Sequence, residues 1–269
     1  MGNFYGLIGD KLGHSFSPVI HEMILKKINL QGKYNLFEIE SQNLGEAIGA
    51  LKILGCRGVN VTIPYKIKIM KYMDYISEEA LSIGSINTIQ FVDNKLKAYN
   101  TDYYGFGMTL KRYGIDVLNK SVVILGTGGA SKAVLRYSMD EGAKSIIYVS
   151  RKPENVSNGE IDVISYEQLH HIKSGDIIIN STPCGMYPQT DTCAVDSEIL
   201  SKFNTAVDLV YNPQETTFLK TGKELGLRTA NGLYMLVAQA VAAQQIWQHR
   251  EISLKTLDEI YYKLLNMQQ

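Results

Sequence analysis

The sequence predicts an α/β fold, and three observations point to it. Strand-like and helix-like segments alternate along the whole chain. The apolar run Ser121–Leu125 is typical of a strand that is buried on both faces of a parallel sheet. A glycine-rich turn, a helix to about Glu141 and a second strand, Ser145–Val149, follow it, so this part of the chain forms one βαβ unit.

The N-terminal part predicts a second group of alternating elements. Strands are expected at residues 4–8, 35–39 and 58–63. Helices are expected from Ser17, from about Leu44 to about Leu54, and after Pro64. In the first helix Ser17 would be the N-cap, and Pro18 suits the first turn. Residues 86–91 and 95–99 predict a hairpin around Asp93-Asn94, and a helix follows to about Tyr113.

The remaining elements complete two domains. Buried strands are expected at residues 176–180 and 205–210, and the tail from Gly232 is helical with a break near Arg250-Glu251. The beginning of the βαβ unit sets the predicted boundary. One domain would comprise residues 1–102 with 241–269, and the other residues 103–240.

Composition excludes several classes of protein. The chain of 269 residues is 45% hydrophobic and 20% charged, an ordinary globular mixture. Lys plus Arg and Asp plus Glu both number 27, whereas a nucleic-acid-binding protein usually has a basic excess. The apolar stretch at 232–243 is broken by Gln239 and is shorter than the about 20 residues that cross a membrane. Lys66, Lys68 and Lys71 remain candidates for local anion binding.

The cysteines and the N-terminus predict a cytoplasmic protein. Three cysteines without paired spacing argue against a disulfide framework and against a zinc site, so no metal is expected. The first residues do not combine a basic segment with an apolar one, as a secretory signal would.

The glycine-rich turn predicts a phosphate-binding site. Gly126, Gly128 and Gly129 lie between a strand and a helix, where glycine lets the backbone approach a pyrophosphate and the helix N-terminus favours an anion. Ser131 occupies the position of the third glycine in the usual dinucleotide motif, and a small residue still permits close packing. The alternative is an ordinary tight turn.

The end of the next strand favours NADP over NAD. NAD sites commonly have Asp or Glu here, but this chain has Ser150-Arg151-Lys152. A guanidinium attracts a 2′-phosphate that an acidic side chain would repel. The alternative is that Arg151 and Lys152 are solvated loop charges.

Two further clusters of polar residues are candidates for a substrate site. Ser15 and Ser17 provide two hydroxyls at a helix N-terminus, which suits a carboxylate, although Ser17 could simply cap its helix. Thr62 ends a strand, and Lys66 lies in the first turn of the next helix. The helix dipole disfavours a cation there, which suits a proton-transfer role, and the alternative is a surface lysine.

A third cluster combines an amide with a carboxylate. Asn87 and Asp102 follow predicted strands and could hold adjacent hydroxyls of a ring. Asp102 could also pair with Lys66 and keep it charged, in opposition to the helix dipole. Alternatively, Asp102 only caps the following helix.

Taken in order, these motifs resemble those of bacterial shikimate dehydrogenases. The matching segments in the first half are Gly6-Leu7-Ile8-Gly9, His14-Ser15-x-Ser17-Pro18, Asn60-Val61-Thr62-Ile63-Pro64-x-Lys66, Gly84-Ser85-Ile86-Asn87-Thr88 and Asn100-Thr101-Asp102. Those in the second half are Gly126-x-Gly128-Gly129-Ala130, Asn180-Ser181-Thr182-Pro183-x-Gly185-Met186, Asp208-Leu209-Val210-Tyr211-Asn212-Pro213 and Asn231-Gly232-x-x-Met235-Leu236. Each motif is weak alone, but the ordered set is specific and spans nearly the whole chain.

The resemblance implies two α/β domains with a cleft between them, an N-terminal substrate domain completed by the C-terminal helices, and a Rossmann-type domain that binds NADP. It implies that Lys66 and Asp102 form a catalytic pair. It also implies substrate binding by Ser15, Ser17, Thr62, Lys66, Asn87, Asp102, Tyr211 and Gln239. The implied cofactor-binding residues are Gly126, Gly128, Gly129 and Ala130 for the pyrophosphate, Ser150, Arg151 and Lys152 for the adenosine phosphate, and Thr182, Met186 and Gly232 for the nicotinamide.

The implied activity is the reversible reduction of 3-dehydroshikimate to shikimate by NADPH, a step towards chorismate and the aromatic amino acids. No nucleic acid or membrane partner is expected, and the chain would be a monomer or a homodimer. Three alternatives stay open: an NAD-dependent quinate/shikimate dehydrogenase, a non-catalytic sensor on the same fold, and a one-carbon folate dehydrogenase of similar layout.

Overall fold

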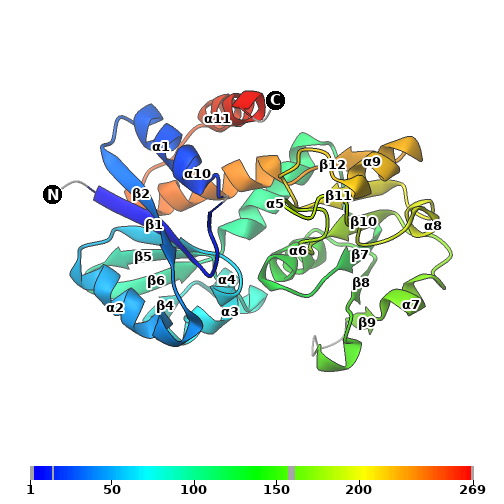
Figure 1. The fold of residues 1–269 in the computed structure, drawn as a ribbon, viewed down its shortest axis with the longest axis horizontal. Coiled ribbons are helices and arrows are strands. Elements are labelled where there is room, and N and C mark those ends of the chain that lie inside the picture. Colours follow the sequence, from blue (N-terminus) through cyan, green and yellow to red (C-terminus); the bar gives the residue numbers. More distant parts are fainter. Residues whose placement is uncertain (1–2, 14, 157–160, 268–269) are drawn as a thin grey trace. The chain divides into compact units, whose positions relative to one another are not determined.

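The computed structural model describes residues 3–13, 15–156 and 161–267. The chain divides into two compact units, one comprising residues 1–105 and 237–269 and the other residues 106–236. Each unit is built around its own six-stranded sheet (Figure 1). Sequence-based alternation of strands and helices therefore predicted the α/β fold class correctly.

The sheet of the first unit is mixed. Its strands are β1 (Asn3–Gly9), β2 (Gly32–Glu38), β3 (Gly58–Val61), β4 (Tyr75–Ile76), β5 (Thr88–Val92) and β6 (Lys95–Tyr99), and their order in the sheet is β2-β1-β3-β5-β6-β4. β1 runs parallel to β2 and β3, whereas β5 is antiparallel to β3 and β6. The predicted hairpin between β5 and β6 is present, and its turn residues Asp93 and Asn94 have φ values of 49° and 59°, as a two-residue hairpin loop requires.

Helices cover this sheet and position the polar residues at its ends. They are α1 (Ser17–Lys27), α2 (Leu44–Ile53), α3 (Tyr65–Lys68), α4 (Glu78–Ile83) and α11 (Leu254–Met267), with the 3₁₀ turns η1 (Ser41–Asn43) and η2 (Ile69–Tyr72). α10 (Leu233–Gln248) begins in the second unit and continues into the first. α1 packs beside α11, and the apolar core between α2 and the sheet includes Ile8, Ile48 and Val59.

One predicted cap is wrong. Ser17 is the first residue of α1, not its N-cap; Phe16 occupies the N-cap position and makes no side-chain capping bond. The Ser15 hydroxyl instead accepts a hydrogen bond from the Ser17 N–H, at 3.2 Å. Both hydroxyls are thus at the beginning of α1, as expected, but Ser17 does not cap the helix.

The sheet of the second unit is entirely parallel. Its strands are β7 (Ser121–Leu125), β8 (Ser145–Val149), β9 (Asp162–Ile164), β10 (Ile177–Asn180), β11 (Thr205–Asp208) and β12 (Arg228–Ala230), in the order β12-β11-β10-β7-β8-β9. Numbered from β7, this is the strand order of a Rossmann dinucleotide-binding fold. The helices are α5 (Thr101–Arg112), which begins in the first unit, α6 (Gly129–Asp140), α7 (Tyr166–Leu169), α8 (Ser197–Leu200) and α9 (Thr217–Glu224), with the 3₁₀ turn η3 (Pro153–Asn155).

Apolar layers cover both faces of this parallel sheet. Along β7, Val122 and Ile124 pack into one hydrophobic cluster, whereas Val123 and Leu125 pack into another. Successive side chains of a strand point to opposite faces, so both faces of β7 are buried. This explains why the strand appears in the sequence as an uninterrupted apolar run. Among the described residues no helix is both long and apolar enough to cross a membrane.

Candidate functional site

Lys66 and Asp102 form an ion pair in the first unit. Lys66 lies on α3, directly after β3, and Asp102 lies in the first turn of α5, directly after β6. The Lys66 Nζ atom is 2.5 Å from Oδ2 of Asp102, and their side chains are only 14% and 8% exposed. Low exposure strengthens an ion pair and limits the number of conformations that either group can adopt.

Asn87 contacts the other carboxylate oxygen of Asp102. Its Nδ2 donates to Oδ1 of Asp102 at 2.8 Å, while its Oδ1 accepts from the backbone N–H of Thr101 at 2.7 Å. A backbone N–H can only donate, so this contact fixes which end of the Asn87 amide is the oxygen. Both oxygens of Asp102 therefore accept hydrogen bonds, an arrangement that suits a carboxylate beside a Lys66 ammonium group.

Asn100, rather than Asp102, caps α5. Its Oδ1 accepts from the backbone N–H groups of Asp102 and Tyr103, at 3.1 and 3.3 Å. The alternative reading of Asp102 as a helix cap is therefore wrong. The Asp102 carboxylate instead forms the contacts with Lys66 and Asn87.

A buried polar network continues behind these residues. Tyr34 donates from its hydroxyl to Oδ1 of Asn60 at 2.9 Å, and Asn60 donates from Nδ2 to the carbonyl of Asn87 at 3.2 Å and to Oγ1 of Thr88 at 3.0 Å. Asn60 and Thr88 appeared in the sequence only as parts of motifs, and Tyr34 gave no signal. Their contacts depend on the pairing of β3 with β5, in which Asn60 lies opposite Thr88.

The other predicted substrate residues of this unit lie near the ends of its elements. Ser15 is half-buried and Ser17 is buried, and the Ser17 side chain also interacts with the Tyr34 hydroxyl. Thr62 follows β3 and donates its backbone N–H to the Ile8 carbonyl, at 2.9 Å. Gln239 is half-buried on α10. His14, which belongs to the same motif as Ser15, lies outside the described residues.

His21 is completely buried beneath this network. Its ring stacks on Tyr34 with centroids 4.0 Å apart, and Nδ1 is 2.9 Å from the Gln244 amide nitrogen of α10. Burial lowers the pKa of His21 to about 3, so the ring is neutral at physiological pH. The amide nitrogen then donates to Nδ1, and the ring proton is on Nε2. His21 thus connects α1 to α10 as a neutral group.

In the second unit the glycine turn has the geometry of an anion cradle. Gly126 has φ of 92°, a conformation that favours glycine, and a Cβ there would come within 2.8 Å of Thr182. Gly128 is the N-cap of the 12-residue helix α6 and has no capping side chain. A Cβ at Gly128 would meet no atom within 4 Å, so open space lies beside this helix N-terminus.

The small residue at the third position of the turn packs as expected. Ser131 is completely buried, and its hydroxyl donates to the carbonyl of Gly128 at 2.6 Å. Tyr148 of β8 donates to the Ser131 carbonyl at 3.0 Å. Gly129 and Ala130 form the first turn of α6, so all four predicted pyrophosphate residues surround one helix start.

The segment after β8 presents its charges to solvent. Ser150 is buried, and its hydroxyl accepts from the N–H of Lys152 at 3.1 Å. Arg151 and Lys152 are exposed. The side chain that anchors the segment is thus the serine, and both cations are accessible to a ligand.

The remaining predicted cofactor residues follow β10 and β12. Thr182 donates from its hydroxyl to Oδ1 of Asn180 at 2.6 Å, and Met186 is 38% exposed. Gly232 is buried so tightly that a Cβ would lie 2.0 Å from the Leu209 carbonyl oxygen. Tyr211, predicted to contact substrate, is half-buried in this unit, and burial raises its pKa.

Asp208 is connected to this region through Asn180, and it was not predicted as a site residue. It is completely buried at the end of β11 and accepts hydrogen bonds from Asn180, Thr216 and the Val210 N–H. Burial raises the pKa of Asp208 to about 7, against the lowering effect of these donors. Within the described residues, no group of three or more His, Cys, Asp or Glu side chains could hold a metal ion.

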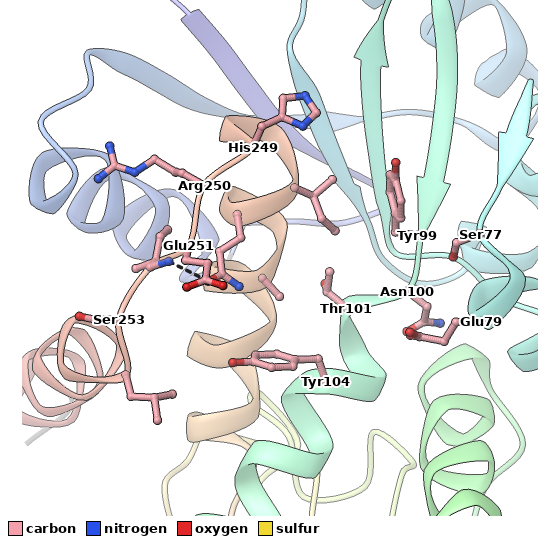
Figure 2. A pocket seen from close by; sticks show the side chains of 15 residues that line it. Ser77, Glu79, Tyr99, Asn100, Thr101, Tyr104, His249, Arg250, Glu251 and Ser253 are labelled. Carbon is pink, nitrogen blue, oxygen red and sulfur yellow. Dashed lines mark hydrogen bonds between the residues drawn. The ribbon is translucent and has the colours of Figure 1, made fainter.

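A pocket of about 810 Å³ lies in the first unit, apart from the predicted site residues. Figure 2 shows Tyr99, Thr101 and Tyr104 on one side of it and His249, Arg250 and Glu251 on the other. None of the residues that the sequence assigns to substrate or cofactor lines this pocket. Thr101 is nevertheless next to Asp102 in the chain and bonds to Asn87, so the pocket backs onto the Lys66–Asp102 cluster.

Comparisons with known proteins identify the family of this chain. Residues 7–89 match the family model of the shikimate dehydrogenase substrate binding domain. Over 261 residues the chain is 48% identical to the shikimate dehydrogenase (NADP(+)) of Clostridium beijerinckii, a match that covers 96% of both chains.

Solved structures extend the similarity to the complete fold. A chorismate mutase/shikimate 5-dehydrogenase fusion protein from Clostridium acetobutylicum is 47% identical with a TM-score of 0.96, covering 99% of this chain and 98% of that chain. Shikimate 5-dehydrogenase from Thermus thermophilus, in complex with NADP(H) and shikimate, is 27% identical with a TM-score of 0.87, covering 97% of this chain and 99% of that chain. The protein therefore belongs to the shikimate dehydrogenase family.

Proposed function

We propose that this protein is an oxidoreductase that catalyses the reversible NADPH-dependent reduction of 3-dehydroshikimate to shikimate. The observation that carries the proposal is the cluster of the half-buried Lys66 with the buried Asp102 and Asn87, in a chain 48% identical to an NADP-dependent shikimate dehydrogenase. A cation held beside a carboxylate at the ends of strands suits general acid–base chemistry on a small polar ligand.

In this proposal the first unit binds the substrate. The hydroxyls of Ser15 and Ser17, at the beginning of α1, bind the carboxylate. Thr62, Asn87, Asp102 and Gln239 bind the ring hydroxyls, and Tyr211 is also assigned to the substrate. Asn87 and Asp102 are already oriented by the hydrogen bond between their side chains.

The second unit has a cradle that fits NADP. The open space at Gly128 and the uncapped start of α6 suit the pyrophosphate, and Gly126, Gly129 and Ala130 complete the turn. The exposed guanidinium of Arg151, flanked by Ser150 and Lys152, suits the 2′-phosphate. Thr182, Met186 and Gly232 are assigned to the nicotinamide pocket.

The reaction needs one hydride and one proton. The hydride for the carbonyl carbon comes from NADPH when it is bound. Lys66 gives a proton from Nζ to the carbonyl oxygen as the C=O bond becomes a C–OH bond. Asp102 fixes the direction of the Lys66 side chain through the 2.5 Å contact between Nζ and Oδ2. In the reverse direction the neutral Lys66 amine takes the proton from the hydroxyl.

The three cysteines are free, and we infer that the enzyme works in a reducing compartment, the cytoplasm. No second chain is needed to complete the set of residues assigned above, and we propose a monomer or a homodimer.

A spectrophotometric assay tests the proposed function. The purified protein should form reduced nicotinamide when given shikimate and NADP⁺, with a higher kcat/KM than with NAD⁺. Binding of shikimate without formation of reduced cofactor would contradict an enzymatic function and favour a sensor. A higher kcat/KM with NAD⁺ and quinate would contradict the substrate and cofactor assignments.

A further inference from the structure

Thr88 has three polar neighbours around one hydroxyl. It is the first residue of β5 and is completely buried. Its Oγ1 lies 3.0 Å from Nδ2 of Asn60, 3.0 Å from Oδ1 of Asn87 and 3.1 Å from Oγ1 of Thr101. Strand pairing fixes this position, because Thr88 lies opposite Asn60 on β3 and opposite Tyr99 on β6.

The direction of the hydrogen bonds at Thr88 follows from its neighbours. The Asn60 atom near the Asn87 carbonyl must be the amide nitrogen, because a carbonyl can only accept. Asn60 therefore donates to Thr88, and Thr88 keeps its own proton for Asn87 or Thr101. The Asn87 oxygen has two lone pairs, one of which accepts from the Thr101 N–H. A hydroxyl proton from Thr88 or Thr101 fills the other.

Both asparagines would lose a partner together with this hydroxyl. One amide hydrogen of Asn60, whose side chain is buried, would have no acceptor, and the Asn87 oxygen would lose one of its two hydroxyl neighbours. A buried polar group without a partner is unfavourable enough to make side chains shift. The Asn87 amide would then be held less firmly, and with it the hydrogen bond that Asn87 donates to Asp102.

We infer that Thr88 is a positioning residue of the reaction. Its hydroxyl fixes the orientation of the Asn87 amide, and the amide in turn positions the Lys66–Asp102 pair. This inference rests on the proposed function. Thr88 acts through Asn87, and nothing requires it to touch the substrate.

The test replaces Thr88 with Val, which has nearly the same shape but no hydroxyl. In the shikimate–NADP⁺ assay, kcat should fall by roughly 10- to 100-fold, because small displacements of catalytic groups have effects of this order. The KM for NADP⁺ should stay unchanged. Thr88→Ser restores the hydroxyl and should restore most of kcat.

Thr109→Val is the matched control. Thr109 is another completely enclosed threonine, on α5, and is not among the residues assigned to substrate or cofactor. This variant should keep wild-type kcat and an unchanged KM for NADP⁺. If Thr88→Val does not fold, Thr88→Cys provides the test, because a thiol is a weak donor of similar size; an intermediate kcat is then expected.

Wild-type kcat in Thr88→Val, or in Thr88→Cys, would overturn the inference. A Thr88→Ser variant as impaired as Thr88→Val would also overturn it, because the hydroxyl would then not matter. These results are distinct from a failure of the proposed function, in which the wild-type protein itself would be inactive in the assay.

Discussion

Lys66 and Asp102 are 36 residues apart in the chain, yet their side chains meet at 2.5 Å. α3 and α5 begin after different strands of one sheet, so the sheet brings their first turns together. An ammonium group at the start of a helix opposes the helix dipole. Asp102 offsets that opposition, and Asn87 holds Asp102 from the other side.

The first prediction concerns the proton donor. Lys66→Ala should lower kcat by about 10²- to 10⁴-fold, the usual contribution of a general acid or base. The KM for shikimate should change much less, since the other polar residues remain. Steady-state kinetics with shikimate and NADP⁺ measures both. Lys68→Ala is the control, because Lys68 lies on the same helix and its Nζ contacts the Ser41 hydroxyl, at 3.3 Å, rather than Asp102. Near-wild-type turnover in Lys66→Ala would contradict the assigned role.

Four of the six strands of the second unit, β7, β8, β10 and β11, could be predicted to within two residues at each end, for a physical reason, whereas the three-residue strands β9 and β12 were not predicted. β7 and β8 are internal, and both faces of β7 are covered, so the sequence shows continuous apolar runs with glycine or charged residues at their ends. The hairpin was equally visible, because Asp93 and Asn94 tolerate the positive φ that its turn needs. By contrast, the two-residue strand β4 is too short to show any period.

The candidate site could be predicted only where a residue type already suggests its chemistry. Lys66, Asp102 and the glycine turn are of this kind. The contacts of Tyr34, Asn60 and Thr88 depend on strand register, and the pairing of Asn60 with Thr88 cannot be read from local pattern. The predicted N-cap of α1 was wrong. A serine before a proline is typical of an N-cap, but Ser17 is the first helical residue, and its backbone N–H donates to the Ser15 hydroxyl.

The second prediction concerns cofactor choice. Arg151→Ala should raise the KM for NADP⁺ by roughly 10- to 100-fold, the effect of losing hydrogen bonds to a charged group. The KM for NAD⁺, which lacks the 2′-phosphate, should stay nearly constant, so the preference for NADP⁺ should fall. Lys152→Ala, which removes the neighbouring exposed cation, should have a smaller effect. An unchanged preference in Arg151→Ala would exclude this residue from phosphate recognition.

The third prediction separates folding from cofactor binding in the glycine turn. Gly128 has φ of −76° and empty space where a Cβ would lie, so Gly128→Ala should cause no backbone strain. Ala is a poorer N-cap than Gly, which offsets the entropic gain, so the free energy of unfolding should change by less than about 1 kcal/mol. The same methyl group would occupy the space assigned to the pyrophosphate, so the KM for NADP⁺ should rise. Gly126→Ala should instead destabilise the protein by about 1–3 kcal/mol, because its φ is 92° and Thr182 is too close.

Thermal unfolding and cofactor titration distinguish these two variants. A Gly128→Ala protein with a nearly unchanged Tm and weakened NADP⁺ binding is the expected outcome. Unchanged binding in that variant would mean that the pyrophosphate lies elsewhere. Equal Tm values for the two variants would contradict the difference in backbone strain between the two positions.

The last prediction concerns the pH dependence of stability and rests on Asp208. Burial raises the pKa of this carboxyl from its ordinary value of 3.8 to about 7 in the folded chain. Between these two pH values the folded protein holds a proton that the unfolded chain has released. The free energy of unfolding should therefore fall as pH rises through this window, by an amount on the order of 4 kcal/mol in total.

In Asp208→Asn this contribution is absent, because an amide does not titrate. Tm measured at about pH 5 and about pH 8 should fall less between the two in the variant than in the wild type. Asp176→Asn is the control, since hydrogen bonds from Ser121 lower the pKa of Asp176 and its titration lies below this range. That variant should keep the wild-type fall, and an equal fall in Asp208→Asn would show that Asp208 is already ionised throughout.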